Sequence, residues 1–416
     1  MIELNYLLIY ITTFFGLFTS IYFFITLYEN HDKILSPKAT RFPGVTIIVP
    51  DYGHPESLKV TIESLLGLNY PKGKLKIFVV INGIDSFAKM QAFKLAKSYE
   101  DKGIETFYAG NVGKGGAINR GIKQTTTEFV GALDADCYCD KNALRRMVAY
   151  FENPNVMAVT PSIQISNAKS FLQRLQKIEF MVGVFLRRVF GFLGSIHITP
   201  GPFTIYRKAF FDKYGAYDES TITEDIEIAL RIQQKNYVIE NATDSLVYTS
   251  GVKEFWPLFN QRIRWYRGFI DNVVKYKVLF GAKTGNLGLF ILPASFFSIG
   301  LTSLLIILSL INAMDNGIKF FLNWKAVNFS IWKLFELKFD LFFISTNSLI
   351  IFTLISLILG LIILHISKDM AQEKETIKLS FLFHFLFYWF LFVMWWGVAT
   401  FYYLTGKKIK WGPREG

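Results

Sequence analysis

Cysteine is nearly absent from this chain: its 416 residues include only two, Cys137 and Cys139, one residue apart. Such a pair cannot build a disulfide framework, and the sequence lacks the further ligands that a zinc site requires. We therefore expect two reduced, buried thiols. Standard nucleotide-binding loops are also missing, because the glycine and lysine spacing of residues 110–121 fits neither a P-loop nor a dinucleotide-binding fingerprint.

Acidic residues are fewer than basic ones, with Asp+Glu 33 against Lys+Arg 45 and a formal net charge of +12. Such a charge is compatible with nucleic-acid binding, but 42 Phe and a hydrophobic content of 51% favour an anionic membrane surface as the partner. We therefore predict membrane lipids and no nucleic acid among its partners. The composition is too apolar for an ordinary soluble enzyme and too charged for a pure membrane bundle, so a soluble domain joined to a few membrane helices fits best.

The first long apolar run covers residues 5–28 and is about one bilayer-spanning helix long. No basic residue precedes it, as one would in a cleaved signal peptide, so we expect a retained anchor. Lys33, Lys38 and Arg41 follow the run, and the positive-inside rule places them in the cytoplasm.

Residues 44–250 have the pattern of an α/β domain. The expected strands are 45–50, 78–81, 129–133 and 156–165, and the expected helices are 56–66, 87–101 and 141–151. Strands that alternate with helices predict a largely parallel sheet covered on both faces. Ligands of such sheets bind beyond the carboxyl ends of the strands.

The rest of the chain returns to the membrane. Three apolar runs are long enough to span it, namely 287–311, 341–365 and 379–404. The stretches 170–194 and 253–280 are too charged to span but keep an apolar stripe, so we expect amphipathic helices at the membrane surface, with 318–340 as a candidate third.

Four spans create a topological difficulty. If the soluble domain is cytoplasmic, the basic tail with Lys407, Lys408 and Lys410 would lie outside the cell, and so would residues 312–340 with their four lysines. Both placements oppose the positive-inside rule. Either one late helix is re-entrant or the protein is an exception, and the sequence leaves both open.

Asp134 and Asp136 directly follow the predicted strand 129–133. Successive strand side chains point to opposite faces, so the pair straddles the strand end, where carboxylates could bridge a divalent cation to phosphates. A solvated turn is an equally good explanation of an isolated Asp-x-Asp. The decision therefore depends on the other motifs.

Four further segments carry polar groups suited to a ligand. Tyr52 follows the first strand and could stack on a base; Lys114 lies in a glycine-rich segment before a helix and could bind an anion. Thr223-Glu224-Asp225 opens a helix, and Gln261, Arg264 and Trp265 share one helical face. Each segment also has a structural explanation. The Tyr52 segment could be an ordinary turn, and Lys114 could be a surface lysine. Thr223 could be an N-cap followed by acids that the helix dipole favours, and Trp265 could lie at the membrane interface with a snorkelling Arg264.

Along the chain the acidic pair comes first, then the Thr-Glu-Asp, and then the Gln-x-x-Arg-Trp of residues 261–265. The order of these motifs resembles that of membrane-integrated family 2 glycosyltransferases. That group includes cellulose, chitin, hyaluronan and poly-N-acetylglucosamine synthases. The resemblance covers residues 1–280 well and the remainder only in general layout. It implies a multi-pass protein of the cell membrane with a cytoplasmic GT-A domain, which is an α/β, Rossmann-like fold.

The resemblance also implies a domain plan. We expect an N-terminal transmembrane anchor at 1–30, the GT-A domain at 31–252, an interfacial helix at 253–285 and a C-terminal transmembrane region with a basic tail at 286–416.

The roles of single residues follow from the same resemblance. Tyr52, Asn82, Lys114 and Asp134 would contact the nucleotide-sugar, and Asp136 would coordinate Mg²⁺ or Mn²⁺ on its diphosphate. Asp225, with Glu224 beside it, would be the catalytic base that deprotonates the acceptor. Gln261, Arg264 and Trp265 would close over diphosphate and acceptor.

Two departures concern the binding of the nucleotide base. Asn82 stands where the family usually has an aspartate, although an amide can still bind uracil as donor and acceptor. Tyr52-Gly53-His54 replaces the usual Tyr-Asn-Glu.

The leading hypothesis is an inverting glycosyltransferase that extends a β-linked polysaccharide from a nucleotide-sugar, with UDP as the expected nucleotide. One alternative is a single addition to a lipid or polyprenyl-phosphate carrier. A more remote one is a non-catalytic membrane glycan-binding protein. Four predicted spans provide few helices to line a polymer channel. A homo-oligomer, which would supply more helices, is therefore also considered.

Overall fold

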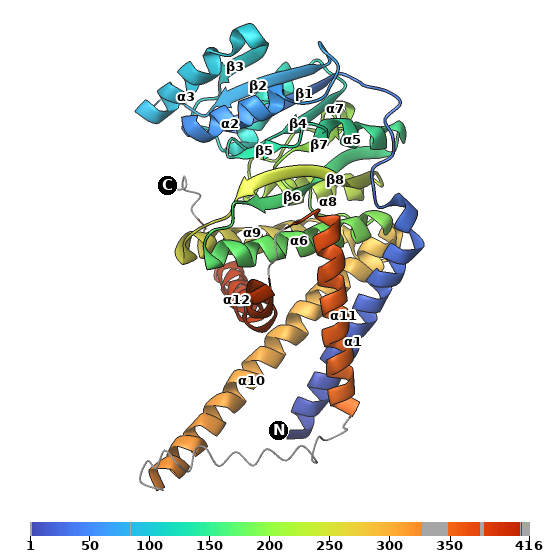
Figure 1. Ribbon diagram of the computed structural model, residues 1–416, viewed down its shortest axis with the longest axis vertical. Helices are drawn as coiled ribbons and strands as arrows, with labels where there is room; N and C mark the ends of the chain where they lie inside the picture. Colours follow the sequence, from blue (N-terminus) through green and yellow to red (C-terminus); the bar gives the residue numbers. More distant parts are fainter. Residues whose placement is uncertain (1, 84, 327–347, 375–377, 408, 410–416) are drawn as a thin grey trace.

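The computed structural model describes residues 2–83, 85–326, 348–374, 378–407 and 409. An α/β domain lies at one end and long helices extend from it at the other, with a layer of two amphipathic helices between them (Figure 1). The predicted fold class is confirmed.

Four parallel strands form the first half of the sheet. They are β1 Val45–Asp51, β2 Leu75–Ile81, β3 Ile104–Tyr108 and β4 Phe129–Ala132, joined by α2 Pro55–Leu66, α3 Phe87–Lys97 and α4 Lys114–Gln124. Every residue of β1 and β4 is buried, as expected for central strands covered on both faces. The carboxyl ends of β1 and β4 therefore point toward the same edge.

The second half of the sheet is mixed, although the sheet as a whole is largely parallel, as predicted. Its strands are β5 Cys137–Cys139, β6 Val156–Ser166, β7 Thr204–Arg207 and β8 Val238–Ser250, and the whole order is β3-β2-β1-β4-β7-β6-β8-β5. The short strand β7 runs antiparallel to both β4 and β6, and β5 runs antiparallel to β8. Strands of three or four residues are too short to show a periodicity in the sequence.

Helices cover both faces of this sheet. One apolar core packs α2, α3 and α5 Ala143–Val148 against it, and the other packs α4, α7 Lys208–Tyr214 and α8 Glu224–Gln234. Two predicted helices are shorter than expected. The 87–101 helix ends at Lys97 and the 141–151 helix at Val148, and a short 3₁₀ helix follows each, Glu100–Lys102 and Ala149–Glu152.

Two amphipathic helices form the layer beneath the sheet, α6 Phe171–Phe192 and α9 Phe255–Lys275. Ser170 and Gln173 form a capping box that fixes the start of α6. Both helices contribute to an apolar cluster with the C-terminal helix α12 Lys378–Leu404. The predicted stretches 170–194 and 253–280 thus form amphipathic helices, and their location at a membrane surface stays a prediction.

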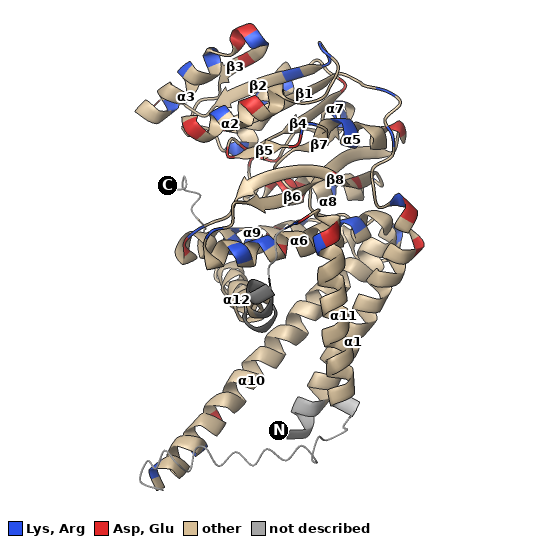
Figure 2. Cartoon of the chain, viewed as in Figure 1, with Lys and Arg blue, Asp and Glu red and all other residues tan. Residues whose placement is uncertain are grey.

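Among the described residues, three helices are long and apolar enough to cross a membrane, with spans at Leu7–Glu29, Leu287–Ala326 and Ile350–Met370. They belong to α1 Ile2–Glu29, α10 Leu292–Ala326 with the π-helical turn Leu287–Ile291 before it, and α11 Ser348–Met370. These helices extend away from the sheet and carry almost no charge along their length (Figure 2). The predicted surface helix 318–340 begins inside α10, and its remainder lies outside the described residues.

Helix α12 has a different direction from the three candidate spans. It is seen end-on in Figure 1, where α1, α10 and α11 run down the picture. Trp396 and Ala399 of α12 pack with Phe269 of α9, and Trp395 is fully buried against Leu258 of α9. The run 379–404, expected to span, thus forms a helix that lies across the others beneath the amphipathic layer.

Candidate active site

A cavity of about 630 Å³ lies where the carboxyl edge of the sheet meets α6, α9 and the candidate membrane spans α1 and α10. It is lined by eight of the residues singled out in the sequence. These are Lys114, Asp134, Asp136, Glu224, Asp225, Gln261, Arg264 and Trp265. Motifs far apart in the chain thus meet around one cavity.

The acidic pair lies in the turn between β4 and β5. The turn is closed by the Cys137 amide, which donates to the Asp134 carbonyl at 2.9 Å. Carboxylate oxygens of Asp134 and Asp136 and the Cys137 sulfur lie within 4.8 Å of one another. Burial raises the pKa of the Cys137 thiol well above its usual value, so the thiol stays protonated and is a poor ligand. The two carboxylates are the donors that suit Mg²⁺ or Mn²⁺.

Lys114 is the first residue of α4 and reaches into the acidic cluster. Its Nζ lies 2.6 Å from Asp134 Oδ1 and 3.9 Å from Glu224 Oε1. Burial lowers the pKa of Lys114, but these carboxylates raise it by more, so its net pKa is raised. A Cβ on Gly201 would stand 2.7 Å from the Lys114 Nζ, so a side chain there would displace the ammonium. The lysine is therefore a firmly charged group beside the predicted metal ligands.

Asp225 stands in the first turn of α8. Burial raises its pKa to about 6, the charge of Glu224 adds to the rise, and Lys114 and Arg264 oppose it. Its backbone carbonyl accepts hydrogen bonds from the amide and the hydroxyl of Thr199, the latter at 2.8 Å. A carboxylate with a pKa just below neutrality and a fixed backbone suits a general base.

Gln261, Arg264 and Trp265 face the cavity from α9. Arg264 Nη1 donates to the Ile222 carbonyl at 3.4 Å, just before the Thr-Glu-Asp segment. One turn later, a Cβ on Gly268 would lie 2.2 Å from Thr223 Oγ1. The glycine therefore permits the close packing of α9 against the start of α8, which places Arg264 beside Asp225.

Arg262, which the sequence did not single out, occupies the middle of the same motif. Its side chain is 0% exposed and pairs with Glu179 of α6. Its guanidinium also lies 4.1 Å from the centre of the Trp265 ring. The arginine thus connects α9 to α6 and supports the ring of Trp265 from behind.

The two remaining predicted residues do not line the cavity. Burial raises the pKa of the Tyr52 phenol, and the charges of Lys114, Glu224 and Asp134 also act on it, so the ring lies near the acidic cluster. Asn82 is only 6% exposed, and its Oδ1 accepts the Val112 amide at 2.9 Å. This amide therefore holds the glycine-rich loop against the end of β2, and its predicted contact with a base stays a prediction.

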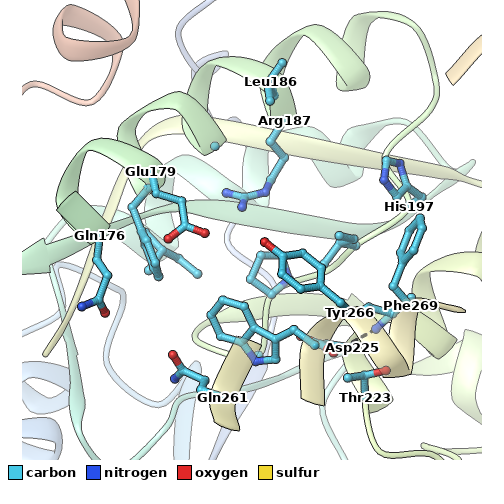
Figure 3. A pocket seen from close by; sticks show the side chains of 18 of the residues that line it. Gln176, Glu179, Leu186, Arg187, His197, Thr223, Asp225, Gln261, Tyr266 and Phe269 are labelled. Atoms are coloured by element: carbon cyan, nitrogen blue, oxygen red, sulfur yellow. Dashed lines mark hydrogen bonds between the residues drawn. The ribbon is translucent and has the colours of Figure 1, made fainter. Parts of the chain in front are cut away.

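A polar wall on α6 was missed in the sequence. Gln176, Glu179 and Arg187 line the cavity, and His197 follows in the next loop (Figure 3). Gln176, Glu179, Gly183 and Arg187 recur at intervals of three or four residues, which puts them on one helical face. That periodicity was the available signal, but the helix was interpreted only as a membrane-surface element.

The family model described as Glycosyltransferase like family 2 matches residues 43–268. A poly-beta-1,6-N-acetyl-D-glucosamine synthase of Staphylococcus epidermidis is 29% identical over 271 residues, which cover 64% of this chain and 65% of the relative. The enzyme of the same name from Staphylococcus aureus strain COL is 28% identical over the same shares. The match thus spans just under two thirds of these relatives.

One solved structure supports the fold. A mannosyltransferase from Pyrobaculum calidifontis, in complex with GDP-Man and Mn²⁺, has a TM-score of 0.56 at 15% identity and covers 87% of this chain and 100% of its own. Since the family model extends over more than half of the chain, from the first strand through the Gln-x-x-Arg-Trp helix, this protein belongs to glycosyltransferase family 2.

Proposed function

We propose that this protein is an inverting membrane glycosyltransferase that moves N-acetylglucosamine from a UDP-linked donor to a growing β-linked polysaccharide. The observation that carries the proposal is the single cavity in which Asp225 meets the acidic pair and the α9 motif. The sugar and the polymer are suggested by the names of the staphylococcal relatives.

Asp225 is the proposed base. With a pKa of about 6 it is mostly a carboxylate at neutral pH and can take the proton of an acceptor hydroxyl. The hydroxyl oxygen then forms a bond to the anomeric carbon while the bond from that carbon to the diphosphate breaks. Because attack and departure occur on opposite faces, an α-linked donor gives a β-linked product.

The leaving diphosphate gains negative charge, and the site has cations to receive it. Lys114 and Arg264 both act on the carboxylate of Asp225, which puts them close to the reacting centre. Mg²⁺ or Mn²⁺ bound by Asp134 and Asp136 would neutralise the diphosphate further, in line with the Mn²⁺ of the mannosyltransferase complex. Trp265 offers a flat apolar face to the acceptor sugar, held by Arg262.

Helix α12 suggests a topology that removes the charge difficulty for the C-terminal tail, whereas Lys319 and Lys325 at the far end of α10 would still lie outside the cell. If α1, α10 and α11 span the membrane and α12 lies in its surface, the basic tail is on the same side as the catalytic domain. Arg267 of α9 donates to the Lys407 carbonyl at 3.4 Å, which supports that placement. The catalytic domain and the tail would then both be cytoplasmic, as the positive-inside rule requires.

A donor screen tests the function. Membranes that contain the protein would be incubated with Mn²⁺ and each radiolabelled nucleotide-sugar, with Asp225→Asn membranes as the control. We expect label from UDP-N-acetylglucosamine in a long polymer that β-specific glycosidases degrade. A single glycolipid product would instead favour single addition, and no turnover of any donor would favour a non-catalytic glycan-binding protein.

A further inference from the structure

Three arginines lie on α6 or on the neighbouring helix α9, and two of them have acidic partners. Arg188 lies 3.6 Å from Glu240 and stacks on Phe192 at 4.3 Å, and Arg262 pairs with Glu179. Arg187 differs. Within the described part of the chain, no carboxylate lies within 4.0 Å of its guanidinium.

The Arg187 side chain projects into the cavity (Figure 3). Its Nη1 donates to the Pro161 carbonyl at 3.5 Å, the far limit of a hydrogen bond. Burial lowers its pKa to about 10, so the group still carries its charge at neutral pH. Arg187 is partly buried, and a charge shielded from water without a counter-charge is costly, which makes an anionic ligand the natural partner.

Lys114, Arg187 and Arg264 are the cations among the described residues that line the cavity. Lys114 and Arg264 act on Asp225 and, in the proposed transfer, would bind the donor diphosphate. Arg187 instead acts on His197, in the loop after α6. The cavity thus has a second positive centre that the proposed transfer does not use.

Beyond Arg187 the cavity continues between the candidate spans. Its lining there includes Phe15 and Thr19 of α1 and Ser295, Ser298 and Ile299 of α10. The Thr19 and Ser295 hydroxyls donate to carbonyls of their own helices. With Phe23 and Ile291 also in the lining, this end suits an apolar chain, and α1 and α10 are helices that lipid would surround. A ligand that fills this end and also reaches Arg187 needs an apolar tail and an anionic head.

We propose that Arg187 binds the phosphate of a membrane lipid whose headgroup hydroxyl serves as the first acceptor. The inference rests on the proposed function and names its primer. The hydroxyl loses its proton to Asp225, its oxygen bonds to the anomeric carbon, and the nucleoside diphosphate leaves. The product is a glycosylated phospholipid from which the polymer can grow.

Lipid binding by the full chain, without donor, tests the site directly. Native mass spectrometry would count the phosphatidylglycerol molecules that the wild type retains. Two comparison ligands each lack one part of this lipid. Dioleoylglycerol has a hydroxyl but no phosphate, and glycerol 3-phosphate has no acyl chains. The variants are Arg187→Gln, Arg187→Lys and, as a matched control on the exposed face of the same helix, Arg174→Gln. Melting curves show whether each variant is folded.

We expect the wild type and Arg174→Gln to retain phosphatidylglycerol at least about tenfold better than dioleoylglycerol, and Arg187→Lys to keep most of this preference. Arg187→Gln should lose it. Equal retention of the two lipids by the wild type would overturn the proposal even if Arg187→Gln failed to fold. The proposal would also be overturned if the wild type bound glycerol 3-phosphate as well as phosphatidylglycerol. The same holds if folded Arg187→Gln kept the wild-type preference for phosphatidylglycerol over dioleoylglycerol.

The primer step has its own readout. Radiolabelled UDP-N-acetylglucosamine given to wild-type protein in phosphatidylglycerol nanodiscs should label a chloroform-soluble product, and label there should fall at least tenfold in Arg187→Gln. Polymer without any labelled lipid would refute the primer while leaving the proposed function intact. If the protein retained phosphatidylglycerol but turned over no donor, the proposed function would be contradicted, and the primer role with it. The lipid site at Arg187 would still stand.

Discussion

Lys114 Nζ lies 2.6 Å from Asp134 Oδ1, so a lysine from the glycine-rich segment pairs with the first carboxylate of the acidic pair at the strand end. The same ammonium is the first cation that a donor diphosphate would meet beside the predicted metal ligands. We expect Lys114→Met to raise the KM for the nucleotide-sugar about tenfold or more, because a charge-assisted contact is lost. Lys123→Met, on the exposed face of α4, is the control and should leave KM unchanged.

The metal role predicts a paired effect of chelation and mutation. EDTA should abolish transfer by the wild type, and added Mn²⁺ or Mg²⁺ should restore it, because two carboxylates stand ready for a hard cation. Asp136→Ala should remove activity that no added metal restores. Activity that persists in EDTA would contradict the assignment of Asp136.

Asp225 predicts the acid limb of the pH profile. Its pKa of about 6 means that the base becomes protonated below that pH, so kcat/KM should fall about tenfold per pH unit there. Measurement with saturating metal between pH 5 and pH 8 tests this limb. A flat profile down to pH 5 would show that Asp225 is not the titrating base.

The same raised pKa predicts an effect on stability. The folded protein binds this proton more tightly than the unfolded chain, whose pKa is near 3.8, so the contribution of Asp225 to stability decreases as the pH rises through about 6. Asp225→Asn should therefore raise the unfolding temperature at pH 8 but have little effect at pH 4. Thermal unfolding in detergent at both pH values provides the comparison.

The close packing at Gly268 predicts that a larger residue there would misplace Arg264. An alanine Cβ there would collide with Thr223, so Gly268→Ala should push α9 away from the start of α8 and misplace Arg264 against Asp225. Because misplacement by about 1 Å can cost about a hundredfold in rate, we expect kcat to fall by roughly that factor. Gly300→Ala on α10 is the control, since no described atom lies within 4 Å of its Cβ.

The sequence predicted those features that local patterns encode. Asp134 and Asp136 follow a continuous apolar strand, and Gln261, Arg264 and Trp265 share a helical face, so their placement followed from chemistry and periodicity. Features set by tertiary packing were not predictable. The Asn82 side chain accepts a hydrogen bond from the Val112 amide, which is a contact between two loops distant in the sequence.

The direction of α12 and the position of Arg187 in the cavity also depend on tertiary structure. The run 379–404 has the length and apolar character of a span, and only its packing against α9 reveals that it lies across the others. Arg187 and Arg188 are neighbours in sequence, yet one has an acidic partner and the other faces a cavity. Composition cannot distinguish two such residues.

The central claim is that Asp225 is the base of an inverting sugar transfer. It is tested most directly by single-turnover transfer from radiolabelled UDP-N-acetylglucosamine with Mn²⁺, in the wild type and in Asp225→Asn, with UDP binding measured in parallel. We predict a β-linked product from the wild type and a rate at least about a thousandfold lower for Asp225→Asn, with UDP still bound. Wild-type rates in Asp225→Asn, or an α-linked product from the wild type, would contradict the claim.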